Sequence, residues 1–280
     1  MSDWGKGVIN NIGWGQGADN DIGWGSIYDK SNAGETLLSG GGFDTDYQAV
    51  LDFATSEGDT LPSSSQQVIG NALVVQLKNI GVWNKLGSLA MFATDGDDGF
   101  SLIDWKRLAK MTIEGTVVRT ENEGWKGNGT DGTINSGYKL QDLTQFDPSN
   151  SLGSFGGWAF DAKAVTTNPL CGDEDTINQI RGGFADGIFG TRAGDNTLTT
   201  GLYMMNSDSV NAIHIINGVV KNTQALTPVR VSTSNFHALS EGGSNFSLDK
   251  IAILFVGGNL LTEQLDFYNA LETYMDAIAS

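Results

Sequence analysis

The chain has 280 residues, enough for one large domain or two modest ones. Its 33 acidic against 16 basic residues give a formal charge of −17, which argues against nucleic acid and membrane surfaces as partners because both are anionic. The absence of any apolar run near the roughly 18 residues of a membrane span excludes a transmembrane helix, and a single cysteine excludes a disulfide within the chain.

The first segment, residues 1–42, carries three Trp-Gly pairs ten residues apart, in the strings I-N-N-I-G-W-G and N-D-I-G-W-G. This period fits neither a coiled-coil heptad nor a common solenoid, and three copies cannot bury a core of their own. The segment therefore either folds back on its own domain or docks on another protein. We favour an anchoring arm, with contacts expected at Trp4, Ile12, Trp14, Ile22, Trp24 and Tyr28.

Two short amphipathic helices are predicted between residues 44 and 90. Asp44 or Thr45 can cap the first helix, whose apolar face carries Tyr47, Val50, Leu51 and Ala54. The second follows a serine-rich stretch and can end at Gly81, with an apolar face of Ile69, Leu73, Leu77 and Ile80. We assign residues 43–110 to a helical hairpin and connector that packs against the following domain.

From residue 111 onward, short apolar runs alternate with turns rich in Gly, Asn and Asp, a pattern typical of β-strands. Asn217-Gly218 is a strong signal for a two-residue hairpin turn. Seven or more strands at this spacing predict an antiparallel sandwich over residues 111–280. The candidate strands are 116–120, 157–161, 176–184, 202–205, 210–216, 229–233 and 250–257.

The chain is expected to end in a helix. Thr262 can cap it, and Glu263 complements the positive end of the helix dipole. Its expected apolar stripe consists of Leu265, Tyr268, Leu271, Met275 and Ile278.

Few residues suggest catalysis or cofactor binding. His214 lies within an apolar strand and is interpreted as structural, and His237 lies in a polar loop without a neighbouring Cys or His to share a metal. Acidic neighbours disfavour a thiolate at Cys171. Motifs of serine hydrolases, phosphate-binding loops and zinc proteases do not occur, and we expect no cofactor.

Paired carboxylates are the remaining route to catalysis, since glycosidases need two of them across a sugar. Sandwich glycosidases commonly place them as E-x-D-x-x-E on one strand, and this string is absent. Glu57 with Asp59 runs into Leu61-Pro62, and Glu121 with Glu123 runs into Gly124-Trp125. A retaining hydrolase is therefore disfavoured, and we expect no enzymatic activity.

Two loops could bind ligands. Asp95, Asp97 and Asp98 resemble part of a calcium loop but lack the later Glu of an EF-hand, so a solvated turn is favoured over a weak calcium site. Trp125, flanked by polar residues, could stack against a sugar as a glycan contact, although residues 127–138 read best as a loop joining strands.

Short motifs along nearly the whole chain resemble a family of virion proteins of tailed phages, especially phages of Bacteroidetes. They are "LKNIGVWNK" at 77–85, "GNGTDGTINSGY" at 127–138 and "LTEQLDFYNALETYMDA" at 261–277, together with the N-terminal IGWG repeats. Where the family has "NLKDP", residues 102–106 read "LIDWK", a weaker match. The resemblance implies a concanavalin-like jelly-roll sandwich in a phage particle, and its motifs carry over no catalytic residues.

The resemblance also implies a function. The expected protein is a virion structural component, a head- or tail-attached fibre, spike or decoration protein docked by its arm and made in the bacterial host cytoplasm. Its partners would be capsid, portal or tail proteins and sister subunits, with a homotrimer expected by analogy with fibres. A lectin for a host surface glycan is the alternative, and a glycan hydrolase is a third, less favoured one.

Overall fold

The computed structural model describes residues 42–146, 152–161, 169–173, 179–181, 184–186, 192–194, 200–225 and 234–280. The chain divides into two units, Met1–Gly42 and Phe43–Ser280, and the second is the unit described below. The expected anchoring residues Trp4, Ile12, Trp14, Ile22, Trp24 and Tyr28 lie outside the described residues, as does the expected strand 229–233.

The helices begin where the sequence supplies caps. The carboxylate of Asp44 accepts a hydrogen bond from the backbone N–H of Asp46 (2.9 Å) at the start of α2 (Thr45–Glu57). Ser63 caps α3 (Ser64–Asn79) in the same way, and Gly81 follows its end with a φ of 75°. The predicted apolar face of α2 is buried, which confirms the first helix. Shorter helical turns are η2 (Trp83–Lys85), α4 (Asp98–Ser101) and η3 (Leu140–Asp142).

Within the described residues, the strands form two antiparallel sheets. The large sheet has the order β15-β14-β13-β8-β17-β1-β2-β3, and the β5–β6 hairpin joins it because β6 pairs with β17. Its strands are β1 (Leu86–Met91), β2 (Ile103–Asp104), β3 (Ala109–Lys110), β5 (Val117–Thr120), β6 (Gly124–Gly127), β8 (Leu152–Ala159), β13 (Gly201–Asp208), β14 (Asn211–Ile216), β15 (Val219–Ala225) and β17 (Lys250–Gly257).

The small sheet has the order β12-β11-β10-β9-β16-β7-β4. Its strands are short, and they are β4 (Thr112–Glu114), β7 (Thr133–Asn135), β9 (Pro169–Gly172), β10 (Gln179–Arg181), β11 (Phe184–Asp186), β12 (Arg192–Gly194) and β16 (His237–Ala238). The two sheets pack face to face as an antiparallel jelly-roll sandwich, which confirms the expected fold class.

The large sheet is buried on both faces, so its strands alternate between two cores. In β1, Leu89 and Met91 pack towards the helices, whereas Ala90 and the following Phe92 pack towards the small sheet. Burial on both faces explains why the sequence of β17, KIAILFVG, is an almost unbroken apolar run. The 250–257 strand predicted from that run has the observed bounds.

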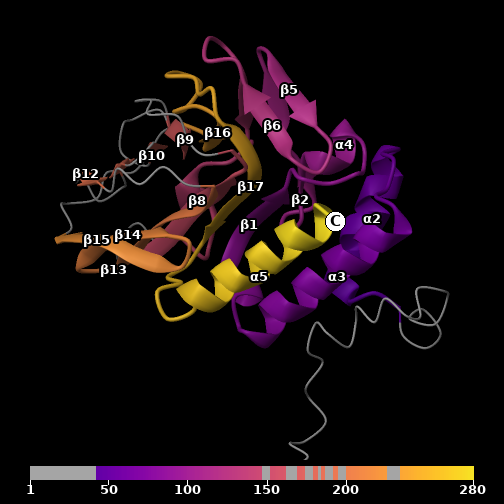
Figure 1. Cartoon of the computed structure of the whole chain (residues 1–280), viewed down its shortest axis with the longest axis horizontal. Helices are drawn as coiled ribbons and strands as arrows, with labels where there is room; N and C mark the ends of the chain where they lie inside the picture. Colours follow the sequence, from indigo (N-terminus) through magenta and orange to yellow (C-terminus); the bar gives the residue numbers. More distant parts are fainter. Residues whose placement is uncertain are drawn as a thin grey trace, which may run out of the picture. The chain divides into compact units, whose positions relative to one another are not determined.

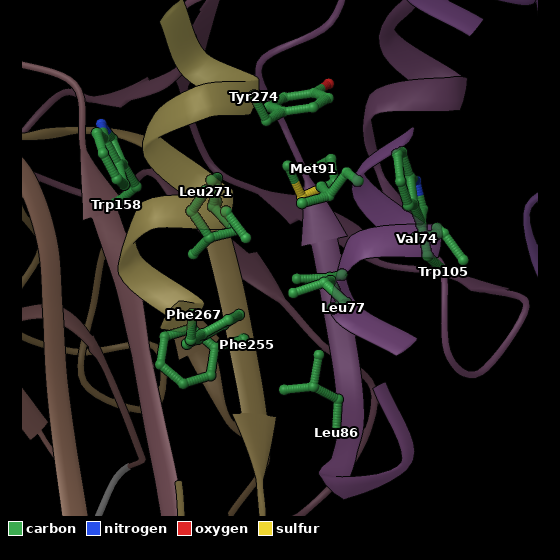
Figure 2. Packing of buried hydrophobic residues seen from close by; sticks show 14 of the residues in the cluster. Val74, Leu77, Leu86, Met91, Trp105, Trp158, Phe255, Phe267, Leu271 and Tyr274 are labelled. Carbon is green, nitrogen blue, oxygen red and sulfur yellow. The ribbon is translucent and has the colours of Figure 1, made fainter. Parts of the chain in front are cut away.

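A helical layer covers the outer face of the large sheet (Figure 1), and it includes α5 (Gln264–Ile278) lying beside α3. Figure 2 shows Phe267 of α5 against Phe255 of β17, with ring centroids 5.0 Å apart at 81°. The hydroxyl of Tyr274 donates a hydrogen bond to the carbonyl of Ala93 (3.0 Å). In the described part of the chain, no helix is long and apolar enough to cross a bilayer.

Residues 43–110 are not a separate connector, contrary to the sequence analysis. They supply β1, which lies between β17 and β2 near the middle of the large sheet, as well as β2 and β3. The helices α2 and α3 share one core with α5 and this sheet. The sandwich therefore begins before residue 111, because its sheet requires β1 beside β17.

The predicted C-terminal helix is confirmed, and Leu271, Met275 and Ile278 of its predicted stripe are buried, but the predicted cap and the predicted burial of Leu265 are wrong. Its N-terminal cap is Glu263, paired with Lys85 (2.7 Å), rather than Thr262. Leu265 is 53 % exposed, and Tyr268 is partly buried against the core. The buried face is turned toward the sheet by large aromatic residues, and it consists of Phe267, Ala270, Leu271, Tyr274, Met275 and Ile278.

The Asn217-Gly218 hairpin between β14 and β15 is confirmed. Both residues have positive φ values, 50° and 71°, as a type I′ turn requires. The amide oxygen of Asn217 also accepts a hydrogen bond from the N–H of Leu202 (2.8 Å), which ties the turn to β13.

Candidate functional site

A cluster of polar side chains lies on the outer face of the small sheet, on three adjacent strands. Glu114 comes from β4, Asn135 from β7 and His237 from β16. Their sequence neighbours Ile134, Phe236 and Ala238 are buried between the sheets, and side chains alternate along a strand. The alternation therefore places the three polar residues on the outer face. We call Glu114, Asn135, Asn235 and His237 the outer-face cluster.

Hydrogen bonds connect the members of the outer-face cluster. Asn135 Nδ2 donates to Glu114 Oε1 (2.8 Å), and Asn235 Nδ2 donates to Asn135 Oδ1 (3.0 Å). His237 Nδ1 lies 2.9 Å from the carbonyl oxygen of Asn235, which can only accept, so Nδ1 carries the proton. His237 Nε2 faces Glu114 Oε2 at 3.7 Å, a pair that is ionic when the imidazole is protonated.

Two cluster members, Asn135 and His237, are paired across β7 and β16, and Thr112 and Gly172 extend this row on either side. The adjacent row is apolar and consists of Ile113, Ile134, Ala238 and Cys171, of which the last three are buried between the sheets. This contrast indicates that β4, β7, β16 and β9 have one core face and one outer face.

A strained loop adjoins the cluster. Leu239, directly after β16, has a φ of 64°, which is uncommon for a branched side chain. The loop continues through Gly242 and Gly243, also at positive φ, and a Cβ built on Gly243 would lie 4.0 Å from His237 Nε2. Backbone held in such a conformation concentrates at functional sites.

His237 is buried and lies in strand β16, not in the polar loop expected from the sequence. The alternation of Phe236, His237 and Ala238 could have indicated a strand, although two residues are too few to establish a period. Glu114, Asn135 and Asn235 were missed altogether, because their proximity depends on strand pairing between distant segments.

Trp125 is not an exposed platform for a sugar. Its side chain is 3 % exposed in the core between the sheets, and its Nε1 donates a hydrogen bond to Ser101 Oγ (3.1 Å). On β6 the exposed residue is its neighbour Lys126, because successive side chains point to opposite faces. The proposed glycan contact at Trp125 is therefore wrong.

The turn that carries Asp95, Asp97 and Asp98 is held by the guanidinium of Arg119. Arg119 donates to the carbonyl oxygens of Thr94 (2.5 Å) and Gly96 (2.6 Å) and pairs with Asp98 (3.2 Å). Within the described ranges, no three Asp, Glu, His or Cys side chains form a group that could hold a metal ion. The Arg119 guanidinium thus binds the carbonyl and carboxylate oxygens of this turn, as a metal cation would in a calcium loop.

The other two carboxylates of this turn accept backbone hydrogen bonds. Asp95 accepts one from Ser63 (3.0 Å), and Asp97 accepts from Thr60 (2.7 Å) and Phe100 (2.9 Å). Burial by itself would raise the pKa of Asp97, but these two N–H donors bring the pKa below its usual value. The turn therefore fixes the loop that leads into α3.

Replacing Arg119 tests this arrangement. Arg119→Ala is expected to lower the free energy of unfolding by about 2 kcal/mol, because it leaves two carbonyl oxygens and a carboxylate without their charged donor. Arg119→Lys keeps the charge but not the forked geometry, so it should recover less than half of the loss. Urea denaturation measures both, and equal stability of all three proteins would contradict the role of Arg119.

The other residues that the sequence analysis considered for catalysis are buried in the core or form ion pairs. His214 is fully buried in β14, and Cys171 is buried in β9 between the sheets. The pair Glu57 and Asp59 contacts Lys110, at 3.8 and 2.7 Å.

A scan against models of protein families and a search of curated proteins found no match. Among solved structures, a mutant of Trypanosoma rangeli sialidase displaying trans-sialidase activity is 11 % identical, covering 74 % of this chain and 39 % of that one, with a TM-score of 0.48. Domain 4 of a GH43 extracellular arabinanase from Geobacillus stearothermophilus is 16 % identical, covering 66 % and 98 %, with a TM-score of 0.42. The receptor-binding domain of the botulinum neurotoxin C/D mosaic serotype is 12 % identical, covering 69 % and 52 %, with a TM-score of 0.44.

The chain thus spans about two fifths of the length of the sialidase. Two of these three structures come from enzymes and one from a receptor-binding domain. At these identities the similarity concerns the β-sandwich fold alone.

Proposed function

We propose that the protein is a non-enzymatic structural component of a phage virion, a head- or tail-attached fibre, spike or decoration protein. Residues 1–42 dock on the particle, and the sandwich is displayed outward. The partners would be capsid, portal or tail proteins, together with sister subunits in a homotrimer. The protein would be made in the host cytoplasm and incorporated into the virion there.

The observation that carries this proposal is the division of the chain at Gly42. All three Trp-Gly pairs fall in the first unit, Met1–Gly42, and the sandwich falls in the second. An appendage needs this organisation, with an attachment segment separate from the part that is displayed. The motif resemblance to virion proteins of tailed phages supports the same assignment.

The acidic residues that the sequence analysis considered for catalysis form ion pairs, which supports the non-enzymatic part of this proposal. Asp59 and Glu57 pair with Lys110, and Glu123 pairs with Lys250. A general acid needs a raised pKa and room for a sugar beside it. Here lysine ammonium groups, rather than room for a sugar, lie beside these carboxylates.

Energetics explain why the Trp-Gly repeats would need a partner. Enclosing a Trp buries about 150–250 Å², which at roughly 25 cal/mol per Å² is worth up to about 4–6 kcal/mol. Ordering about 25 residues costs more than roughly 1 kcal/mol per residue in backbone entropy. Three tryptophans cannot offset that cost alone, so backbone pairing with a particle protein or with sister chains must contribute.

Because the tryptophans would supply a large part of the energy that offsets this ordering cost, Trp14→Ala with Trp24→Ala is expected to abolish incorporation into particles. The measurement is the amount of protein in purified virions when the variant is the only copy supplied. The matched control, Asn11→Ala with Asp21→Ala, alters the same two repeats but keeps both tryptophans and should be incorporated normally. Normal incorporation of the tryptophan variant would contradict the anchoring role, provided that both variants show the wild-type melting temperature.

A further inference from the structure

The geometry points to a glycan-binding site at the outer-face cluster, in which Glu114 and Asn135 bind hydroxyl groups of a neutral glycan. This inference does not depend on the arm or on the virion assignment. It rests on the exposure of Glu114, on the hydrogen-bond donors and acceptors of the cluster and on their preorganisation.

The small sheet has an accessible position on its outer face at Glu114. The outer face of the large sheet is covered by α2, α3 and α5, which share a core with it. On the small sheet, Glu114 has a side chain that is 47 % exposed, and the adjoining Gly243 and Ser244 are exposed as well. A ligand can therefore approach Glu114 from the side of the exposed loop.

The chemistry of the cluster suits hydroxyl groups. A sugar hydroxyl both donates and accepts, so it is best recognised by an acceptor and a donor side by side. Glu114 supplies carboxylate lone pairs, and Asn135 Nδ2 has a second N–H besides the one that it donates to Glu114. The carboxylate and the net charge of −17 disfavour an anionic ligand.

The side chains are also held in place before any ligand binds. Asn135 Oδ1 accepts hydrogen bonds from Asn235 Nδ2 (3.0 Å) and from the N–H of Gly137 (2.8 Å), which fixes the amide plane and directs Nδ2 toward Glu114. These hydrogen bonds link the side chains of Glu114 in β4, Asn135 in β7 and Asn235 in the segment before β16. Immobilised groups lose less entropy on binding, so their hydrogen bonds contribute more to affinity.

The test is affinity electrophoresis of the full-length protein in gels containing dextran, mannan, laminarin, arabinan or galactomannan, with pectate as an anionic comparison. We expect retardation by at least one neutral polysaccharide and none by pectate. Glu114→Gln and Asn135→Ala should each weaken that binding at least tenfold by calorimetry, as expected for the loss of a hydrogen bond to a charged or preorganised group. Glu121→Gln, which removes the same charge from an exposed position outside the cluster, should leave the affinity unchanged.

Three results would overturn the site. They are no retardation by any of the neutral polysaccharides, retention by pectate alone, or binding that Glu114→Gln and Asn135→Ala leave intact. Both positions are at least partly exposed, so folding should survive, and near-ultraviolet circular dichroism checks this for each variant. His237 is not substituted in this test because it is buried and its removal could unfold the sheet.

Discussion

Asp104→Ala is expected to lower the free energy of unfolding by about 3–5 kcal/mol. The side chain of Asp104 is fully buried, and it accepts hydrogen bonds from the Ser88 hydroxyl (2.7 Å) and from the N–H groups of Leu89 (3.2 Å), Lys106 (3.0 Å) and Arg107 (3.2 Å). Each buried donor left without an acceptor costs about 1–3 kcal/mol. Urea denaturation at neutral pH measures the loss.

Asp104→Asn is the matched control. Its Oδ1 can still accept from the three backbone N–H groups, and its Nδ2 can donate to Ser88 Oγ, because a hydroxyl group both donates and accepts. We expect this variant to keep most of the stability lost in Asp104→Ala. If both variants were equally destabilised, the charge rather than the hydrogen-bond geometry would hold this loop.

The pH dependence separates charge from geometry further. Burial raises the pKa of Asp104, although the hydrogen bonds from Ser88 and the backbone oppose this shift. A raised folded-state pKa gives stability that is fully present below about pH 4, the unfolded value, and is lost as the pH rises through the folded value. The wild type should therefore lose stability relative to Asp104→Asn over that window. A difference that does not vary with pH would contradict the raised pKa.

Local patterns predicted those elements in which the spacing or the run of apolar residues reports their burial. The 3.6-residue spacing of Tyr47, Val50, Leu51 and Ala54 identified α2, because this helix buries a single face. The apolar run of β17 identified its bounds. Caps at Asp44 and Ser63 fixed where helices begin, since capping needs only residues close in sequence.

Long-range pairing explains what sequence patterns missed. Strand β1 contains Gly87 and Ser88 and is buried on both faces, so it has no alternation, and its partner β17 lies at the other end of the chain. The outer-face cluster depends on strands of two or three residues and on a hydrogen bond between Asn135 and Asn235, which are 100 residues apart. The order of the strands in the sheets creates such contacts, and the spacing of residues within a short segment does not predict them.

The environment of Trp125 was predicted wrongly from its polar neighbours in the sequence. A second stability experiment tests the burial that the structure shows. Its neighbours Gly124 and Lys126 suggested an exposed ring, but Lys126 occupies the solvent side of β6 and the indole occupies the core. An exposed Trp would tolerate substitution within about 0.5 kcal/mol. A buried one would not.

Trp125→Ala is expected to lower the free energy of unfolding by about 3–5 kcal/mol, since it removes a buried ring and leaves a cavity between the sheets. Trp125→Phe keeps an aromatic ring in the core but loses the hydrogen bond to Ser101, so its loss should be nearer 1 kcal/mol. Because Trp125 lies inside the sandwich and the outer-face cluster outside it, Trp125→Phe should bind polysaccharide with wild-type affinity. A stable Trp125→Ala protein that had lost glycan binding would reverse both conclusions, placing the ring at the surface and the sugar on it.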